Sequence, residues 1–250
     1  MFPIGHVYGT IRIVQQLASQ YKAVILAVDS RSAHRYEVLP EYKAGRHAPT
    51  GDPYEDYKIM TDLMNILKIC TFQSNVFYIK HDGMESDDII ASWIASSFSD
   101  DTRDLYCYFN DVDILQTPGR YHWFRSFHEP EVDRVSYIKE KFGLEMDHLP
   151  VWWKVVRGDS SDGIPSSIPR YPSKKLRVIC QDLSQSLSVD GFLAKMDVPV
   201  DREAIERNYN VIVPRIVSVS EFKLKRLGAS YDEVMDLLKG YQIIDYVPAG

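Results

Sequence analysis

Several features of specialised proteins are absent from this sequence. Its three cysteines, Cys70, Cys107 and Cys180, are widely spaced and form no CxxC pair, which excludes a disulfide scaffold and favours reduced, buried thiols. No run of about 18 consecutive apolar residues is present, so we expect no membrane span and no membrane partner. The N-terminus, MFPIGH, lacks the basic region and cleavage site of a secretory signal. We therefore expect a cytoplasmic protein.

The sequence also lacks the motifs of several enzyme classes. There is no P-loop, no GxGxxG and no HExxH, and the seven histidines are scattered without a Ser/His/Asp or Cys/His order. The chain of 250 residues is 45% hydrophobic and 26% charged, as in ordinary globular proteins. Its net charge of −6 argues against non-specific nucleic-acid binding, unless the acids are concentrated in one place.

Apolar patterning predicts an α/β protein with a parallel central sheet. In the first half, helical spacing alternates with short apolar runs that suit strands buried on both faces. These elements are helices at 7–20, 54–69 and 87–98, and strands at 23–28, 75–79, 105–109 and 121–124. This alternation is typical of parallel sheets with crossover helices.

The second half is predicted to be helical. Its expected helices lie at 134–142, 147–157, 173–187, 201–212 and 231–239. The Trp152–Trp153 pair in one of them suits core packing better than base stacking. We predict an α/β domain at 1–148 and a helical region at 149–250.

Acidic residues are concentrated where the chain passes from one predicted element to the next. They are Asp29, Glu85, Asp87, Asp88, Asp111, Asp113, Asp159 and Asp162. Because parallel sheets place their sites at the carboxyl ends of strands, these side chains are expected to converge. Two carboxylates about 4 Å apart repel by about 4 kcal/mol at an effective dielectric of ~20. Oxygen ligands without His or Cys favour Mg²⁺ or Mn²⁺ as the compensating ion.

Each acidic segment taken alone has a structural explanation. ESDD (85–88) fits ordinary helix capping with Ser86 as the N-cap residue. Asp29 fits a turn after a strand, and GDSSDG (158–163) fits a loop. Only their convergence would indicate a metal site.

Basic residues form two groups. Lys43 and Arg46 lie three positions apart, with Arg35 upstream. In RYPSKKLR (170–177), Lys174 and Lys175 follow Ser173, a predicted N-cap, and helix starts attract phosphate. The alternative is an ordinary solvated face.

Four segments in this order resemble the motifs of the 5′-nuclease family. That family comprises flap endonucleases, the 5′-3′ exonuclease domain of bacterial DNA polymerases, and bacteriophage 5′-exonucleases including the phage ribonuclease H. The segments are YKAGR (42–46), ESDD (85–88), NDVDILQ (110–116) and GDSSDGIP (158–165). The similarity extends from about residue 7 to residue 165.

The resemblance implies a PIN-like α/β domain that holds two divalent ions, Mg²⁺ or Mn²⁺. Residues matching the first metal cluster are Asp29, Glu85, Asp87 and Asp88, and those matching the second are Asp111, Asp113, Asp159 and Asp162. Lys43 and Arg46 match a basic pair at the scissile phosphate, and Arg35 and Tyr42 are expected to contact nucleic acid nearby. A metal pair about 3.5–4 Å apart activates water and stabilises the leaving oxygen, while the basic pair offsets phosphoryl charge.

This sequence departs from the family pattern in three places. Family members begin with a strand ending in aspartate, whereas Met1–Pro3 lead almost directly into the first predicted helix, so we expect a sheet without that strand. Either the chain starts upstream, another chain supplies the strand, or activity is reduced. SSIPRYPSKK (166–175) replaces the family's G-x-G turn, which leaves duplex binding to Ser166, Ser167, Lys174 and Lys175, with a monovalent cation near residues 159–168. Gly163 replaces an asparagine.

The resulting hypothesis is a metal-dependent 5′-3′ exonuclease and flap endonuclease. It would act as a monomer on branched or 5′-ended duplex DNA, including RNA–DNA hybrids, in replication or repair. Its partners would be replication proteins such as a single-strand binding protein, in the host cytoplasm if a phage encodes it. The alternatives are a protein that holds branched DNA without cutting it and a PIN-like ribonuclease.

Overall fold

The computed structural model describes residues 5–45, 53–99, 104–183 and 188–243. The chain forms two compact units, each assembled from separate segments. The first comprises residues 1–28, 48–81 and 220–250, and the second comprises residues 29–47 and 82–219. Neither unit begins or ends at residue 148, and the division into a sheet domain and a helical region stays a prediction.

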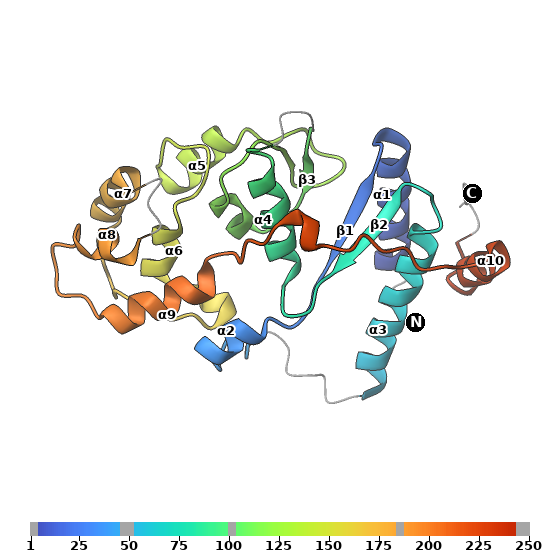
Figure 1. The fold of residues 1–250 in the computed structure, drawn as a ribbon, viewed down its shortest axis with the longest axis horizontal. Coiled ribbons are helices and arrows are strands. Elements are labelled where there is room, and N and C mark those ends of the chain that lie inside the picture. The colour runs from blue at the N-terminus through green and yellow to red at the C-terminus, as the bar shows by residue number, and fades with distance from the viewer. Residues whose placement is uncertain (1–4, 46–52, 100–103, 184–187, 244–250) are drawn as a thin grey trace. The chain divides into compact units, whose positions relative to one another are not determined.

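The first unit contains a pair of parallel strands covered by helices. Strand β1 (Val24–Val28) pairs with β2 (Val76–Lys80) from Val24↔Val76 to Val28↔Lys80. The helices of this unit are α1 (Gly5–Gln20), α3 (Pro53–Cys70) and α10 (Tyr231–Gly240). Helix α1 packs against α3 and β1, and α10 packs against α3 (Figure 1). The Lys68 ammonium pairs with Glu233 at 2.5 Å, which links α3 to α10.

The second unit contains a second parallel pair, β3 (Tyr106–Tyr108) and β4 (His122–Phe124). Its α-helices are α2 (Ala33–Val38), α4 (Ser86–Ser96), α5 (Arg134–Phe142), α6 (Val151–Arg157), α7 (Ser173–Asp182), α8 (Val189–Leu193) and α9 (Arg202–Ile212). Its 3₁₀ turns are η1 (Val112–Gln116) and η2 (Ser160–Asp162), and a third turn, η3 (Val219–Glu221), lies where the two units meet along the chain.

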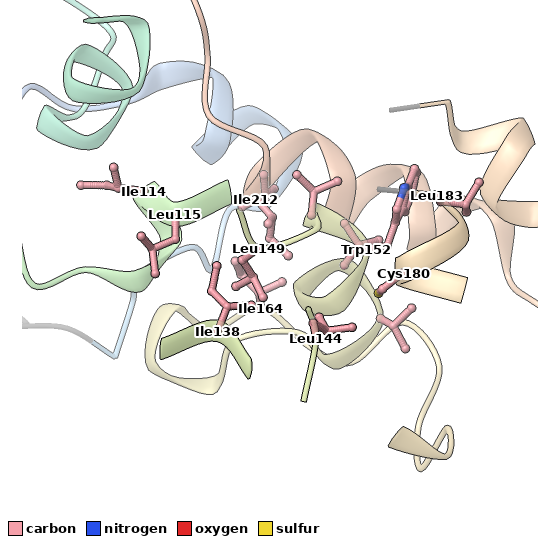
Figure 2. Packing of buried hydrophobic residues seen from close by; sticks show 14 of the residues in the cluster. Ile114, Leu115, Ile138, Leu144, Leu149, Trp152, Ile164, Cys180, Leu183 and Ile212 are labelled. Atoms are coloured by element: carbon pink, nitrogen blue, oxygen red, sulfur yellow. The ribbon is translucent and has the colours of Figure 1, made fainter. Parts of the chain in front are cut away.

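One hydrophobic cluster fills the second unit. Figure 2 shows side chains of η1, α5, α6, α7 and α9 packed together in it. Trp152 is fully buried, and its ring stacks on Phe192 at 4.5 Å and on Tyr209 at 5.3 Å. The prediction that the Trp152–Trp153 segment serves core packing is confirmed for Trp152. Because aromatic side chains bury large areas, this stack holds α6, α8 and α9 together.

The structure confirms most of the predicted elements. Every predicted strand and helix is present, with ends displaced by a few residues. The single predicted sheet, however, is two separate two-stranded sheets within the described part of the chain. Helices α2 and α8 were not predicted, because each is too short to show a helical repeat of apolar residues.

The three cysteines are buried and unpaired, as the sequence predicts. Burial raises the pKa of each thiol to about 12, so each stays protonated and packs as a small apolar side chain. Over the ranges that the structure describes, no helix has both the length and the hydropathy to cross a membrane.

Candidate functional site

The start of α4 supplies the first acidic group. Glu85 is the N-cap residue, and its backbone N–H donates to Asp88 Oδ2 at 3.1 Å in a capping box. Ser86, the N-cap expected from the sequence, is instead the first helical residue. These carboxylates therefore accept hydrogen bonds from backbone N–H groups, in addition to any ligand that they bind.

Arg35 is buried against this acidic group. Its Nη1 and Nη2 donate to the two oxygens of Asp88 at 3.0 and 2.6 Å, and Nη1 also donates to Glu85 Oε2 at 2.9 Å. Its Nε donates to the Val211 carbonyl at 2.9 Å. Burial alone would lower the pKa of Arg35, but the charge of Asp88 raises it. Arg35 is 6% exposed and anchors these carboxylates, and its contact with nucleic acid stays a prediction.

Asp88 has no oxygen left for a metal ion in this arrangement. Besides Arg35, it accepts hydrogen bonds from the backbone N–H groups of Glu85 and Arg215, the latter at 2.9 Å. Each oxygen thus accepts two hydrogen bonds, which fills the lone pairs of a carboxylate. Asp88 thus anchors Arg35 in this arrangement, and its role as a metal ligand stays a prediction.

Tyr42 and Lys43 also bind Glu85. The Tyr42 hydroxyl and the Lys43 ammonium donate to Glu85 Oε2 at 3.0 and 2.9 Å. Burial, with the nearby charge of Glu85, raises the pKa of Tyr42, which keeps its hydroxyl protonated. Tyr42 is 4% exposed and positions Glu85, and its contact with nucleic acid stays a prediction.

Lys43 links two acidic segments that are distant in sequence. Its side chain reaches Glu85, while its backbone N–H donates to the Asp162 carbonyl at 2.8 Å. Lys43 has a φ of 56°, a left-handed conformation that is uncommon for residues other than glycine. Gly163, at φ 72°, also packs here, and a Cβ atom would lie 2.9 Å from the Glu41 carbonyl oxygen. A side chain larger than glycine would therefore disturb this junction. Arg46 lies outside the described residues.

Three carboxylates of the site form no ion pair with a described residue: Asp29, Asp87 and Asp111. Asp29 Oδ1 accepts from the Ser86 backbone N–H at 2.7 Å, which ties Asp29 to the start of α4. Burial, followed by the charges of Asp111 and Asp29, raises the pKa of Asp87 to about 7. Asp29 and Asp111 are thus near enough to Asp87 to act on its charge, and the binding of a metal ion by these carboxylates stays a prediction.

The remaining acids are bridged by a lysine that the sequence analysis did not identify. The Lys154 ammonium, on α6, contacts Asp113 Oδ1 and lies 2.7 Å from Asp159 Oδ2. Burial opposes the charge on Lys154, but the two carboxylates raise its pKa. Asp159 also accepts from the Ser161 hydroxyl at 2.6 Å. Burial would raise the pKa of Asp159, yet the hydrogen bonds of Lys154 and Ser161 lower it.

These residues fit a divalent cation, although they do not already form a finished cage. Within residues 5–45, 53–99, 104–183 and 188–243, no three Asp, Glu, His or Cys side chains are grouped closely enough to ligate one ion. Arg35, Lys43 and Lys154 each form an ion pair with a carboxylate of the site. The donor set contains only oxygen, as Mg²⁺ and Mn²⁺ require. A cation beside Asp87 would also relieve the repulsion that raises its pKa.

The predicted duplex-binding residues fall into two groups. Ser167 is buried, and its hydroxyl donates to the Val155 carbonyl at 2.8 Å, while Ser166 donates to the Val156 carbonyl at 2.8 Å. Both hydroxyls thus cap the end of α6. Ser167 is buried and Ser166 is half-buried, and the contact of either residue with nucleic acid stays a prediction.

Lys174 and Lys175 lie exposed in the first turn of α7. The N-cap residue of α7 is Pro172, and the predicted cap, Ser173, is the first helical residue. Lys175 forms an ion pair with Asp197. Lys174 has no ion-pair partner in the described part of the chain, so it is the more available of the two for phosphate.

This chain is similar in sequence to one protein family and to two curated proteins. The family described as 5′-3′ exonuclease, N-terminal resolvase-like domain, matches residues 1–143. A 5′-3′ exonuclease of Buchnera aphidicola subsp. Acyrthosiphon pisum is 24% identical over 180 residues, which cover 69% of this chain and 58% of that protein. DNA polymerase I of Bacillus caldotenax is 23% identical over 198 residues, covering 76% of this chain and 21% of the polymerase. The alignments thus span less than two thirds of either curated relative.

Solved structures of bacteriophage T5 proteins share the fold. A T5 protein co-crystallised with metal ions superimposes with a TM-score of 0.63 and 18% identity, covering 98% of this chain and 95% of that one. The T5 flap endonuclease, in a pseudo-enzyme–product complex with DNA and metal ions, gives 0.62 and 18%, covering 94% and 89%. The T5 5′-exonuclease with bound zinc gives 0.59 and 18%, covering 95% and 81%.

The predicted fold class, an α/β protein with parallel strands of the PIN-like type, is confirmed by these similarities. The family matches more than half of the 250 residues. This chain belongs to the 5′-3′ exonuclease family with an N-terminal resolvase-like domain.

Proposed function

We propose that this protein is a divalent-metal-dependent 5′ nuclease that hydrolyses phosphodiester bonds at the 5′ ends or flaps of DNA. The observation that carries the proposal is the group formed by Asp29, Asp87 and Asp111. These carboxylates come from three separate segments and form no ion pair with a described residue, and burial together with the charges of Asp111 and Asp29 raises the pKa of Asp87 to about 7. Asp29 and Asp111 each accept one backbone hydrogen bond, but the unpaired negative charge of the group suits a bound cation.

The proposal assigns the carboxylates different roles. Asp29, Asp87, Asp111 and one oxygen of Glu85 would hold one ion, Mg²⁺ or Mn²⁺. Asp113, Asp159 and Asp162 would hold a second after the Lys154 ammonium has moved away. Bound divalent ions supply a nucleophilic water near neutral pH and stabilise the leaving oxygen.

The basic residues of the chain would orient the substrate. Lys43 is held by Glu85 beside the acidic group, where its ammonium can offset charge on phosphoryl oxygens. We place Arg46 with it on the strength of the YKAGR motif. Arg35 keeps Glu85 and Asp88 in place through its ion pairs with them.

DNA is the proposed partner, supported by the DNA complex of the similar T5 flap endonuclease. Lys174, Lys175 and Ser166 would contact the duplex backbone, with a monovalent cation near residues 159–168. We retain RNA–DNA hybrids as substrates, a single-strand binding protein as a partner, and a monomer as the active form.

The direct test is cleavage of a 5′-labelled flap substrate by the purified protein in Mg²⁺, in Mn²⁺ and in EDTA. We expect short 5′ products with either metal and none in EDTA. Binding without product in both metals would indicate a protein that holds branched DNA, and preferential cleavage of single-stranded RNA would indicate a PIN-like ribonuclease. Either result would reject the proposal.

A further inference from the structure

Arg35 also lines a pocket that contains none of the acidic residues of the candidate site. It has a volume of about 470 Å³ and opens between α2, the end of α9 and the segment that follows α9. Its polar lining consists of Ser32, His34, Arg35, Tyr209, Asn210 and Arg215. All of these residues belong to the second compact unit. The acidic residues of the candidate site do not line this pocket.

The pocket is rich in hydrogen-bond donors that lack partners. Arg35 has five N–H protons, of which four are used by Val211, Glu85 and Asp88. The remaining proton lies on Nη2, the same nitrogen that bonds to Asp88 Oδ1. Arg35 is 6% exposed and Ser32 is 3% exposed, so two nearly buried donors line the cavity.

Two further donors in the pocket have no hydrogen-bonding partner among the described residues. They are the exposed guanidinium of Arg215 and the hydroxyl of Tyr209, which stands on a ring stacked against Trp152. Arg215 is held by its backbone, because its N–H donates to Asp88 Oδ1 at 2.9 Å. A fixed backbone with an unengaged guanidinium suits bidentate binding of an anion.

The end of α9 also presents carbonyl oxygens, which would repel an anion. Two of them are already bonded: the Asn210 carbonyl contacts His34 Nε2 at 3.1 Å, and the Val211 carbonyl accepts from Arg35. A carbonyl can only accept, so His34 Nε2 carries a proton. No acid lines the pocket, and the two carbonyls are already hydrogen-bonded. Glu85 and Asp88 balance the charge of Arg35, so the positive charge that favours an anion is that of Arg215, which has no ion-pair partner among the described residues.

We propose that this pocket binds the phosphoryl group of a nucleotide, with the phosphate between Ser32, Arg35 and Arg215. A volume within the range of about 300–1,000 Å³ typical of small-molecule pockets leaves space for the attached sugar. The phosphate belongs either to a nucleic-acid strand or to a free nucleoside monophosphate. Its assignment to a nucleotide rests on the proposed nuclease function, whereas the anion site does not.

The test is isothermal titration calorimetry in EDTA, which removes metal-mediated binding to the acidic group. The probes are a deoxynucleoside 5′-monophosphate and a short 5′-phosphorylated oligonucleotide. Arg215→Ala should weaken binding by about 10- to 100-fold, as expected for a hydrogen bond to a charged group. Arg215→Lys should recover part of the loss. Arg125→Ala removes an exposed arginine that does not line the pocket, and it should change affinity by less than about twofold.

The outcomes separate this proposal from the nuclease assignment. Binding of the oligonucleotide alone would place a strand phosphate in the pocket, and binding of both probes would include the free nucleotide; each supports the site. No binding of either probe in EDTA, or equal losses for Arg215→Ala and Arg125→Ala, would overturn it. If the wild-type protein binds nucleotide but does not cleave DNA, the proposed nuclease function is rejected and the proposed pocket is supported. If it cleaves DNA but does not bind nucleotide, the nuclease function is supported and the proposed pocket is rejected.

Discussion

The Arg35 contacts allow a quantitative prediction about how the acidic site is held together. Replacing Arg35 by Met preserves an apolar stem but removes four hydrogen bonds, three of them to Glu85 and Asp88. Asp88 is 1% exposed and would keep only two backbone donors. Removing one partner of a buried ion pair costs about 3–5 kcal/mol, because the other charge stays buried without compensation. We therefore expect Arg35→Met to lower the free energy of unfolding by about this amount.

The assay is urea denaturation at pH 7 in EDTA, monitored by circular dichroism. Arg31→Met is the matched control, because Arg31 is exposed and only stacks on Tyr36 at 4.5 Å; it should cost about 1 kcal/mol or less. Adding Asp88→Asn to Arg35→Met should restore part of the loss, with a coupling energy of at least about 1 kcal/mol. A loss below about 1 kcal/mol for Arg35→Met would refute the reasoning, since Arg35 would then not stabilise the carboxylates.

Three further predictions concern charge at the site. Because the pKa of Asp87 is raised to about 7, its ionisation in the folded state opposes folding. Asp87→Asn should therefore raise stability at pH 8 and not below pH ~4, as two denaturation series would show. Lys154→Met leaves Asp113 and Asp159 to repel each other, so it should destabilise the metal-free protein by roughly 1–3 kcal/mol and increase the stabilisation by Mn²⁺ in a thermal shift assay. Lys174→Ala should make the negative slope of log K against log salt for duplex binding shallower by about 0.9.

Each of these has a contradictory outcome. If the gain in stability from Asp87→Asn does not depend on pH, then burial and the neighbouring charges do not raise the pKa of the Asp87 carboxylate. Lys154→Met with an unchanged response to Mn²⁺ would mean that the ammonium does not compete with metal, and Lys139→Met, an exposed lysine paired with Glu145, is the control. An unchanged salt slope for Lys174→Ala would make that lysine part of a solvated face.

Local features of the sequence predict the elements of the fold well. Strands β1 and β2 are short apolar runs, and helix α1 buries Val7, Ile11 and Val14 at helical spacing. The pairing of strands is different, because it depends on which strands become neighbours in space. Apolar runs alone therefore could not show that the strands form two separate pairs.

The residues of the candidate site were also predictable only where local sequence features identify them. The acids are predictable because they follow strands or open helices, and Lys43 because it lies in the YKAGR motif. The burial of Arg35 is not, since its partners Glu85 and Asp88 lie 50 and 53 positions away. One feature of the sequence could have identified Lys154. It lies five residues before Asp159, on a helix whose C-cap residue is Gly158, so the turn brings the two side chains together.

The measurement that tests the central claim most directly is metal-dependent cleavage of a 5′-labelled flap by wild-type protein and by Asp111→Ala. Asp111 is exposed, and among the described residues its side chain accepts one local hydrogen bond, from the Asp113 N–H at 2.9 Å, so the variant should keep its circular dichroism spectrum. We predict that the wild type releases 5′ products with Mg²⁺ or Mn²⁺ and that folded Asp111→Ala does not. Cleavage by Asp111→Ala at the wild-type rate, or wild-type cleavage that persists in EDTA, would contradict a reaction carried by these carboxylates.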